Sequence, residues 1–360
     1  MTRLSTRTLN RTTFERQLLL ERADLSTVDA TERLLGLNAQ GPNLPYLALW
    51  NRLRDFEIKD LTAAIEDGSL VRSTLMRATQ HLLSVADFRL IRPAVAPLLV
   101  RVQRNAWGKS TVGIDLDALV ADARRLLAEG PLTRPQLGKR LAESRPGADP
   151  TALGWTVQYL EPLVHPAPSG TWNVHGATPF ASAEWTGATG KTDLPEMIRR
   201  YLAAFGPASV SDARAWSGVG GLKEVFEEMR PELRTYTDEN GRELFDLPDA
   251  TLASADLPAP VRLVPDFDAP LLAFADRTRV MTDEVRKAVC IGASVAATVL
   301  VDGTVAAKWS TKKTKDSVEL TVEPLRLLSK VERAAIEAEA ARLLAFTEPG
   351  LKGVVSGMTG

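Results

Sequence analysis

The chain has 360 residues, 44% hydrophobic and 25% charged, a composition typical of folded globular proteins rather than disordered ones. Its 44 Lys and Arg residues against 45 Asp and Glu give a net charge of −1, which excludes a generally basic nucleic-acid coat. The first residues, MTRLSTRTLNRTTF, lack the apolar core of a secretory signal, and the longest mostly apolar run, CIGASVAATVLV, is too short to span a membrane. With one cysteine, Cys290, and three histidines, we expect no disulfide, no metal, no cofactor and a cytoplasmic location.

The stretch GLNAQGP, residues 36–42, follows a helix-like run and places two amides, Asn38 and Gln40, two residues apart. The glycines and the proline around them indicate a non-helical loop. In an extended segment, residues i and i+2 point to the same side, so both amides are expected to converge on one point. The alternative is an ordinary loop, in which Gln40 caps the preceding helix and Asn38 fills a surface turn.

Residues 60–71 predict a helix that Gly68 stops, and residues 70–77 and 79–85 predict paired strands. A long helix follows over residues 86–107, with a kink or break expected at Pro93 and Pro97. Basic residues outnumber acids by seven to one between Leu70 and Lys109: Arg72, Arg77, Arg89, Arg92, Arg101, Arg104 and Lys109 against Asp87. Such a cluster in a neutral chain indicates contact with a polyanion, or else a solvated basic face.

Two segments repeat one pattern, LLAEGPLTRPQLGKRLAE and YLAAFGPASVSDARAWSG. In each, Gly-Pro ends a helix, and a hydroxyl residue then caps the next helix with a polar residue three positions later. Each continues with a further helix and two strands, in LVHPAPSGTWNVHG for the first and around Asn240-Gly241 for the second. Three helices and a hairpin are the order of a winged helix-turn-helix. We predict an α+β, helix-rich fold with three tandem winged-helix modules, at residues 1–113, 114–190 and 191–255.

Residues 256–360 predict a C-terminal α+β unit, with strands on both sides of an Asp302-Gly303 type I′ turn and a helix over residues 331–346. The hairpin carries Lys308, Trp309 and the basic run KWSTKKTK; it either reaches into a DNA groove or buries Trp309 and exposes its lysines. Asp268 and Arg277 are expected to form a buried ion pair, with a place beside the active site as the alternative. The tryptophans Trp50, Trp155 and Trp216 and the tyrosines are expected in the core.

Five landmarks carry a family resemblance: LLGLNAQGPNLPYLALWNRL, LMRATQHLLSVADFRLIRP, YLAAFGPASVSDARAW, RLVPDFDAPLLAFADR and LVDGTVAAKW. Together they resemble the AlkZ-like DNA glycosylases of bacteria, which are built from tandem winged helices and excise N-alkylated purines. The resemblance implies a catalytic Gln-x-Gln or Gln-x-Asp triplet at residues 38–40, where Gln40 matches and Asn38 is one methylene shorter. It also implies that Arg77, Thr79 and His81, on one strand face, lie near the DNA, although His81 is equally well read as a structural histidine.

These observations predict a monofunctional DNA glycosylase that hydrolyses N7- or N3-alkylated purines in base excision repair, with bulky or cross-linking adducts tolerated. Amides can aim a water but cannot act as bases, which suffices for a cationic leaving group. We expect Asn38 and Gln40 to be catalytic, and DNA contacts from Arg52, Arg77, Thr79, His81, Lys308, Lys312 and Lys313. The partner is double-stranded DNA with alkylated purines, bound by a monomer without a membrane. The alternatives are a non-catalytic DNA-binding regulator or lesion sensor, and a protein–protein scaffold.

Overall fold

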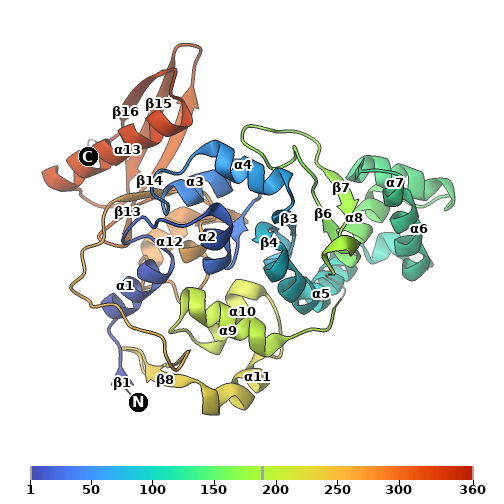
Figure 1. The fold of residues 1–360 in the computed structure, drawn as a ribbon, viewed down its shortest axis with the longest axis horizontal. Helices are drawn as coiled ribbons and strands as arrows, with labels where there is room; N and C mark the ends of the chain where they lie inside the picture. Colours follow the sequence, from blue (N-terminus) through green and yellow to red (C-terminus); the bar gives the residue numbers. More distant parts are fainter. Residues whose placement is uncertain (1, 188–189, 359–360) are drawn as a thin grey trace.

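The computed structural model describes residues 2–187 and 190–358. Figure 1 shows three helix-rich segments grouped around the middle of the molecule, with a C-terminal sheet and one long helix at one end. The structure is a mixed α+β fold, as predicted. No helix within the described ranges combines the length and the apolar character that a membrane span requires.

The first segment runs helix, strand, helix, helix, strand, strand. Its elements are α2 (Thr27–Arg33), β2 (Leu37–Asn38), α3 (Leu44–Trp50), α4 (Ile58–Glu66), β3 (Leu70–Thr74) and β4 (Gln80–Ser84). The strands form an antiparallel sheet with β4 in the middle. Gly36 has a φ of +91°, and a Cβ there would lie 2.8 Å from the Leu83 side chain on β4. Glycine therefore lets the chain leave α2 and enter β2 directly against β4.

The same order occurs twice more. The second segment contains α6 (Leu116–Ala128), β5 (Leu132–Thr133), α7 (Arg134–Glu143), α8 (Pro150–Leu160), β6 (Leu163–Val164) and β7 (Pro179–Ser182), again with its last strand in the middle of the sheet. The third contains α9 (Leu194–Phe205), α10 (Val210–Ser217), α11 (Leu222–Met229), β8 (Arg234–Thr237) and β9 (Glu243–Asp246), and an Ala208–Phe245 bridge replaces the short strand. The capping boxes Thr133/Gln136 and Ser209/Asp212 form as predicted.

Two local predictions are wrong. The break expected at Pro93 or Pro97 does not occur, because the helix α5 (Val85–Trp107) is continuous through both prolines. Proline has a helical φ, and the loss of one backbone hydrogen bond at each ring is outweighed here by a face that is buried along most of the helix. The strand that pairs with β6 was expected within residues 171–176. It is β7, later in the chain, and residues 171–176 form turns instead. Trp172 in these turns packs edge-on against Tyr46 of the first segment, with ring centroids 5.3 Å apart.

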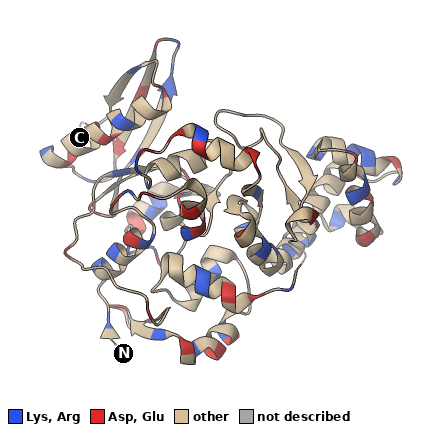
Figure 2. Ribbon diagram, viewed as in Figure 1, with Lys and Arg blue, Asp and Glu red and all other residues tan. Residues whose placement is uncertain are grey.

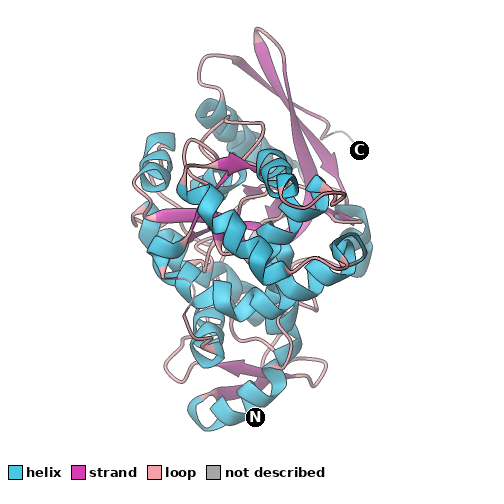
Figure 3. Ribbon diagram, turned by 90° about the vertical axis from the view of Figure 1, so that its right-hand side faces the viewer, coloured by secondary structure: helices cyan, strands magenta, loops and turns pink. Residues whose placement is uncertain are grey.

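The C-terminal unit is a five-stranded sheet of order β10-β13-β14-β15-β16. Its strands are β10 (Arg262–Val264), β13 (Thr298–Val301), β14 (Thr304–Lys313), β15 (Ser317–Pro324) and β16 (Lys352–Ser356). The helix α13 (Lys330–Thr347) lies along one face, where Ile336 and Leu343 join the same buried cluster as Leu320 of β15. The β14–β15 ribbon projects beyond the body of the protein (Figure 1 and Figure 3).

The hydrophobic clusters show which parts share a core. The first segment and the C-terminal sheet contribute to one cluster, and α5 shares a second cluster with α9, α10 and α11. The second segment has a cluster of its own. The N-terminal helix α1 (Thr6–Arg16) connects distant parts, because Arg16 pairs with Asp246 of β9 at 2.8 Å and Arg7 pairs with Asp302 of the C-terminal sheet at 2.7 Å. The site described below lies where these parts meet.

Candidate active site

The two amides of residues 36–42 differ in their burial and in their contacts. The chain is extended here, as predicted: Asn38 ends β2 opposite His81 of β4, and the Ala39 N–H donates to the Gln80 carbonyl at 2.9 Å. The Asn38 Oδ1 accepts a hydrogen bond from the Gln40 backbone N–H at 3.1 Å, and its Nδ2 is buried without a partner. Gln40 is exposed. Both residues line one cavity, and the convergence of their amides on one point stays a prediction.

The alternative in which Gln40 caps the preceding helix is wrong, because that helix, α2, ends at Arg33 with Leu34 as its C-cap. What holds the loop instead is its middle residue. Ala39 is 1% exposed. Arg72 Nε donates to the Ala39 carbonyl at 2.9 Å, and the Ala39 N–H donates to β4. Burial lowers the pKa of Arg72 to about 10, so the guanidinium remains charged at neutral pH. Ala39 is thus fixed on both sides, and Gln40 projects from a rigid base.

The turn between β3 and β4 carries Arg77 and Thr79 rather than a strand, so the prediction that they share a strand face with His81 is wrong. Arg77 and Ala78 have φ values of +54° and +59°, a left-handed conformation that non-glycine residues adopt with strain. The Arg77 guanidinium donates to the Trp216 carbonyl and lies 3.5 Å from His81 Nε2. These contacts with α10 and β4 hold the strained turn in place.

Two residues that were expected to contact DNA are buried. His81 is 4% exposed and its Nδ1 lies 3.1 Å from the Thr79 carbonyl. Burial, and then the Arg77 charge, lower the pKa of His81 to about 3, so the imidazole is neutral at physiological pH. Arg52 is 1% exposed and donates to both Asp268 oxygens, at 2.9 and 2.7 Å. Burial and these internal partners argue against a phosphate contact from either side chain, and the structural alternative fits His81.

A cavity of about 230 Å³ opens beside the loop. Asn38, Gln40, Arg77 and Thr79 line one side, and Phe267, Leu272, Arg277, Cys290 and residues 292–295 line the other. The cavity therefore joins the first segment to the C-terminal unit. Phe267 is a second strained position, with a φ of +59°. It is held by a hydrogen bond of 3.3 Å from its N–H to the Val295 carbonyl, and by the neighbouring Arg52–Asp268 pair.

The expected ion pair between Asp268 and Arg277 is wrong. Asp268 pairs with Arg52, and Arg277 turns to the cavity, where its Nη1 donates to Cys290 Sγ at 3.0 Å. Asp268 therefore pairs with a partner that lies 216 residues away in the chain rather than with an arginine close to it in the sequence. Arg277 lines the cavity beside Asn38 and Gln40, so its alternative place, beside the active site, stays a prediction.

A short hairpin that the sequence reading missed closes the cavity. It consists of β11 (Cys290–Ile291) and β12 (Ser294–Val295) after the helix α12 (Asp283–Val289). Ile291 at its tip is 67% exposed. Gly292 in the turn, with a φ of +58°, is the only local signal that could have revealed it.

Comparisons with known proteins identify the family. The family model described as DNA glycosylase AlkZ-like matches residues 31–346 of the chain. The chain belongs to the AlkZ-like DNA glycosylase family. A relative from Streptomyces sahachiroi, described as an interstrand DNA cross-link repair glycosylase, is 28% identical over 91% of this chain and 93% of its own length. The solved structure of Streptomyces sahachiroi DNA glycosylase AlkZ superimposes with a TM-score of 0.78 at 24% identity, covering 99% of this chain and 100% of that one, which shows a common fold.

In this AlkZ-like glycosylase the hairpin singled out from the sequence is not free to probe a groove. Its Asp302-Gly303 turn has φ values of +47° and +77°, as a type I′ turn requires, but Arg7 and Arg11 of α1 both bind Asp302. Trp309 on the outgoing strand donates its Nε1–H to the Val264 carbonyl at 2.9 Å. The alternative of an inward Trp309 with solvent-facing lysines matches this arrangement.

The lysines of the β14–β15 ribbon are partly engaged. Lys308 pairs with Glu323 at 2.9 Å and Lys313 pairs with Glu348 at 2.7 Å, whereas Lys312 is exposed. Figure 2 shows basic residues on the projecting ribbon. A contact between this ribbon and DNA stays a prediction.

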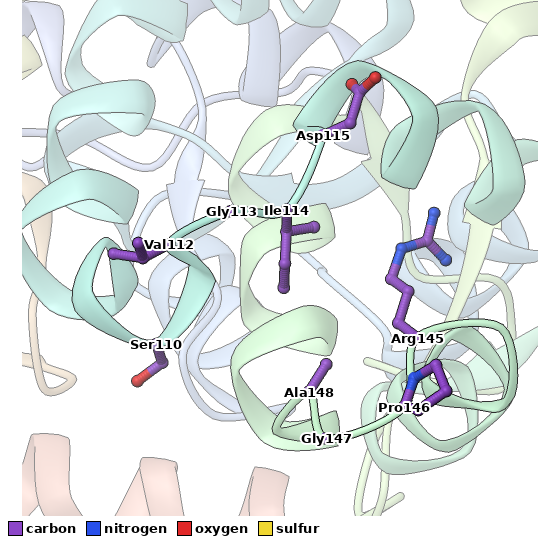
Figure 4. A pocket seen from close by; sticks show the side chains of 9 residues that line it. All are labelled: Ser110, Val112, Gly113, Ile114, Asp115, Arg145, Pro146, Gly147 and Ala148. Carbon is purple, nitrogen blue, oxygen red and sulfur yellow. The ribbon is translucent and has the colours of Figure 1, made fainter.

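The glycosylase has other cavities that lack comparable chemistry. One of about 430 Å³ lies in the second segment, between the turn before α6 and the turn between α7 and α8 (Figure 4). Its Arg145 already pairs with Asp122 at 2.5 Å. Another, of about 530 Å³, lies between residues 15–24 and residues 257–258. Within the described residues, no group of three or more His, Cys, Asp or Glu side chains is placed to hold a metal ion.

Proposed function

We propose that this DNA glycosylase hydrolyses the N-glycosidic bond of N7- or N3-alkylated purines in double-stranded DNA, with Gln40 as the residue that aims the attacking water. The observation that carries this proposal is an exposed amide on a rigid loop, facing a cavity that two arginines share. Alkylation makes the purine a cation and weakens its bond to the sugar. A strong acid or base is then not required, and positioning supplies most of the remaining catalysis.

The two amides take unequal parts in this proposal. Gln40 can both donate to and accept from a water, because its side chain is free and exposed. Asn38 uses its acceptor within the loop, where the bond to the Gln40 N–H orients that residue. Asn38 is therefore proposed to act by positioning Gln40, and the shorter side chain fits that part.

We infer a monofunctional enzyme without lyase activity. A lyase needs an amine that attacks C1′, and none of the described residues that line the cavity is a lysine. Water is then the nucleophile, and an abasic site is the product.

We also propose that the three segments are winged-helix modules, with limits near residues 1–113, 114–190 and 191–255 and the C-terminal unit after them. Each has the helix and strand order of that module. The last strand lies in the middle of the sheet in the first two segments, and in the third it pairs with β8 on one side and forms the Ala208–Phe245 bridge on the other. A single chain that carries several such modules needs no second copy to enclose a duplex, so we infer a monomer.

The hairpin of residues 290–295 is proposed to enter the minor groove beside the lesion. Its exposed Ile291 is an apolar side chain of the kind that wedges between base steps, and the hairpin lines the same cavity as Gln40. Arg77 and Thr79 on the opposite wall are proposed to face the sugar-phosphate backbone, and Lys312 and Lys313 a more distant part of it.

A bulky substrate is compatible with this arrangement. The relative from Streptomyces sahachiroi is named for the repair of interstrand cross-links. Gln40 stands at the surface rather than at the bottom of a deep pocket, so water can attack without a flipped base being enclosed. We propose that large N7 adducts, including cross-links, are substrates as well.

The test is release of 7-methylguanine from methylated duplex DNA under single-turnover conditions. Gln40→Ala is expected to reduce the rate by roughly 100-fold or more, because one positioned polar group at the reacting centre contributes this much. Asn105→Ala, which removes an exposed amide on α5 outside the cavity, serves as the matched control and should release base at the wild-type rate. A Gln40→Ala variant with wild-type release would remove Gln40 from the mechanism.

A further inference from the structure

Arg77 and Arg277 bring two positive charges into one cavity from opposite sides. Arg77 belongs to the strained β3–β4 turn, and Arg277 belongs to the loop between Leu272 and α12. They are close enough that the charge of Arg277, after the larger effect of burial, contributes to lowering the pKa of Arg77 to about 10. With this pKa, Arg77 remains protonated at neutral pH, so it repels the Arg277 guanidinium in the free protein.

No carboxylate balances these charges within the cavity. None of the described residues that line it is Asp or Glu. Three acids near Arg277 in the sequence have other partners: Asp276 binds Arg242 at 2.5 Å and the Thr278 N–H at 2.8 Å, Asp283 binds Arg286 at 3.0 Å, and Asp268 binds Arg52. Burial and Arg277 are the causes that shift the pKa of Arg77, and both act against its charge.

The Arg277 guanidinium also has free donors. Its one side-chain hydrogen bond within the described residues is the 3.0 Å contact from Nη1 to Cys290 Sγ. A thiol is a weak acceptor, so this contact orients the guanidinium without neutralising it. The remaining N–H groups form a fork of the kind that binds phosphate oxygens in pairs.

We propose that Arg277, together with Arg77, forms a binding site for the phosphodiester next to the damaged nucleotide. This inference rests on the proposed function and adds the part of the substrate that the cavity holds. Two guanidiniums without a counter-ion would oppose the positive charge that develops on the sugar as its bond to the base breaks. A phosphate between them removes that opposition and fixes the backbone, so that C1′ faces Gln40.

The first experiment measures binding to a duplex that contains a stable abasic-site analogue, by fluorescence anisotropy over a range of KCl concentrations. Wild type, Arg277→Met and the matched control Arg140→Met are compared. Arg140 is on α7 and pairs with Glu129 at 2.8 Å, away from the cavity. Loss of one phosphate contact lowers the slope of log Kd against log [KCl] by about 0.9. We expect this decrease for Arg277→Met and no decrease for Arg140→Met; equal slopes for wild type and Arg277→Met overturn the proposal.

The second experiment changes the DNA, so its result on the wild-type protein does not depend on the folding of a variant. The phosphodiester on either side of the abasic analogue is replaced in turn by a neutral methylphosphonate. We expect one of the two replacements to weaken wild-type binding and to have no further effect on Arg277→Met, as required of two partners in one contact. If neither replacement weakens wild-type binding, the proposal is overturned.

Base release by wild type, measured in parallel on methylated duplex, separates this inference from the proposed function. Suppose that wild type releases base, that the salt slope is the same for wild type and Arg277→Met, and that neither methylphosphonate weakens DNA binding. The phosphate site is then overturned and the proposed function is not. Absence of release from both methylated and bulky substrates overturns the proposed function, and the inference with it.

Discussion

At the scale of single residues, the Asn38 side chain acts on the backbone of Gln40, two residues later in the chain. Its Oδ1 accepts the Gln40 N–H, an Asx-turn contact that depends on a short side chain. Its buried Nδ2 has no partner, which costs folding stability. A residue that destabilises the fold while it orients the exposed Gln40 is better explained by function than by stability.

Two substitutions test this role of Asn38. Asn38→Gln moves the amide one methylene away from the turn geometry, and Asn38→Ala removes the acceptor. Both are expected to reduce 7-methylguanine release by about tenfold, because loss of a hydrogen bond of about 1 kcal/mol loosens Gln40. Asn38→Ala should leave the melting temperature unchanged or slightly higher, since the unpaired Nδ2 is also removed. Faster release by Asn38→Gln than by wild type would contradict the positioning role.

The basic residues between Leu70 and Lys109 differ in burial, which their number in the sequence does not show. Of the seven basic residues between Leu70 and Lys109, Arg72 and Arg92 are buried. Arg72 binds the Ala39 carbonyl, and Arg92 binds the Tyr159 carbonyl at 3.1 Å. Arg72 therefore braces the loop that carries Gln40, whereas Arg89, Arg101, Arg104 and Lys109 are exposed, so a contact between these four and a polyanion stays a prediction.

At the scale of elements, the third helix of each segment is poorly suited to reading a DNA groove. α11 carries one lysine and three glutamates, and α4 lies between Glu57 and Asp67 (Figure 2). α8 has no charged residue, and it packs on α5, where Trp155 stacks on Trp107 with ring centroids 6.0 Å apart. The groups suited to DNA come instead from turns: residues 38–40, the β3–β4 turn and the β11–β12 hairpin.

The hairpin can be tested through its tip. Ile291→Ser is expected to weaken binding to the abasic-analogue duplex by roughly tenfold, since burying an aliphatic side chain contributes about 1.5–3 kcal/mol. The melting temperature should not change, because Ile291 is already 67% exposed in the free protein. Val331→Ser on α13, where the side chain is 79% exposed, is the matched control and should bind like wild type. Equal binding by Ile291→Ser and wild type would exclude the tip from the interface.

At the scale of the whole molecule, the site depends on contacts between distant parts of the chain. Arg52 at the end of α3 binds Asp268 beside the strained Phe267, and this pair joins the first segment to the C-terminal unit. The two walls of the cavity are held at their separation partly by this contact. The pair is fully buried, so each partner depends on the other for its charge to be tolerated.

Removal of one partner should destabilise the protein strongly. Arg52→Met is expected to lower the free energy of unfolding by about 3–5 kcal/mol, because an unpaired carboxylate remains buried. Chemical denaturation measures this loss, and the double variant Arg52→Met/Asp268→Leu should recover part of it. The salt dependence of DNA binding should stay at the wild-type slope. A stable Arg52→Met variant with a reduced slope would restore Arg52 as a DNA contact.

Local sequence by itself determined much of the fold. The capping boxes at Thr133 and Ser209, the stop at Gly68, the type I′ turn at Asp302-Gly303 and the extended stretch at residues 37–39 all form as predicted. Each depends on residues within a few positions of one another. The location of the loop with Asn38 and Gln40 was predictable for the same reason, and the family resemblance gave it a function.

Tertiary structure alone decided which side chains form the site. Asp268 pairs with Arg52, 216 residues away, and so leaves Arg277 to the cavity. α1 covers the Asp302 turn, whereas the hairpin at residues 290–295 lines the cavity. His81 has the residue type of a catalytic or DNA-binding group, yet its neighbours bury it in a neutral state. Burial, charge pairing and pKa are set by residues far apart in the chain, and local patterns do not encode them.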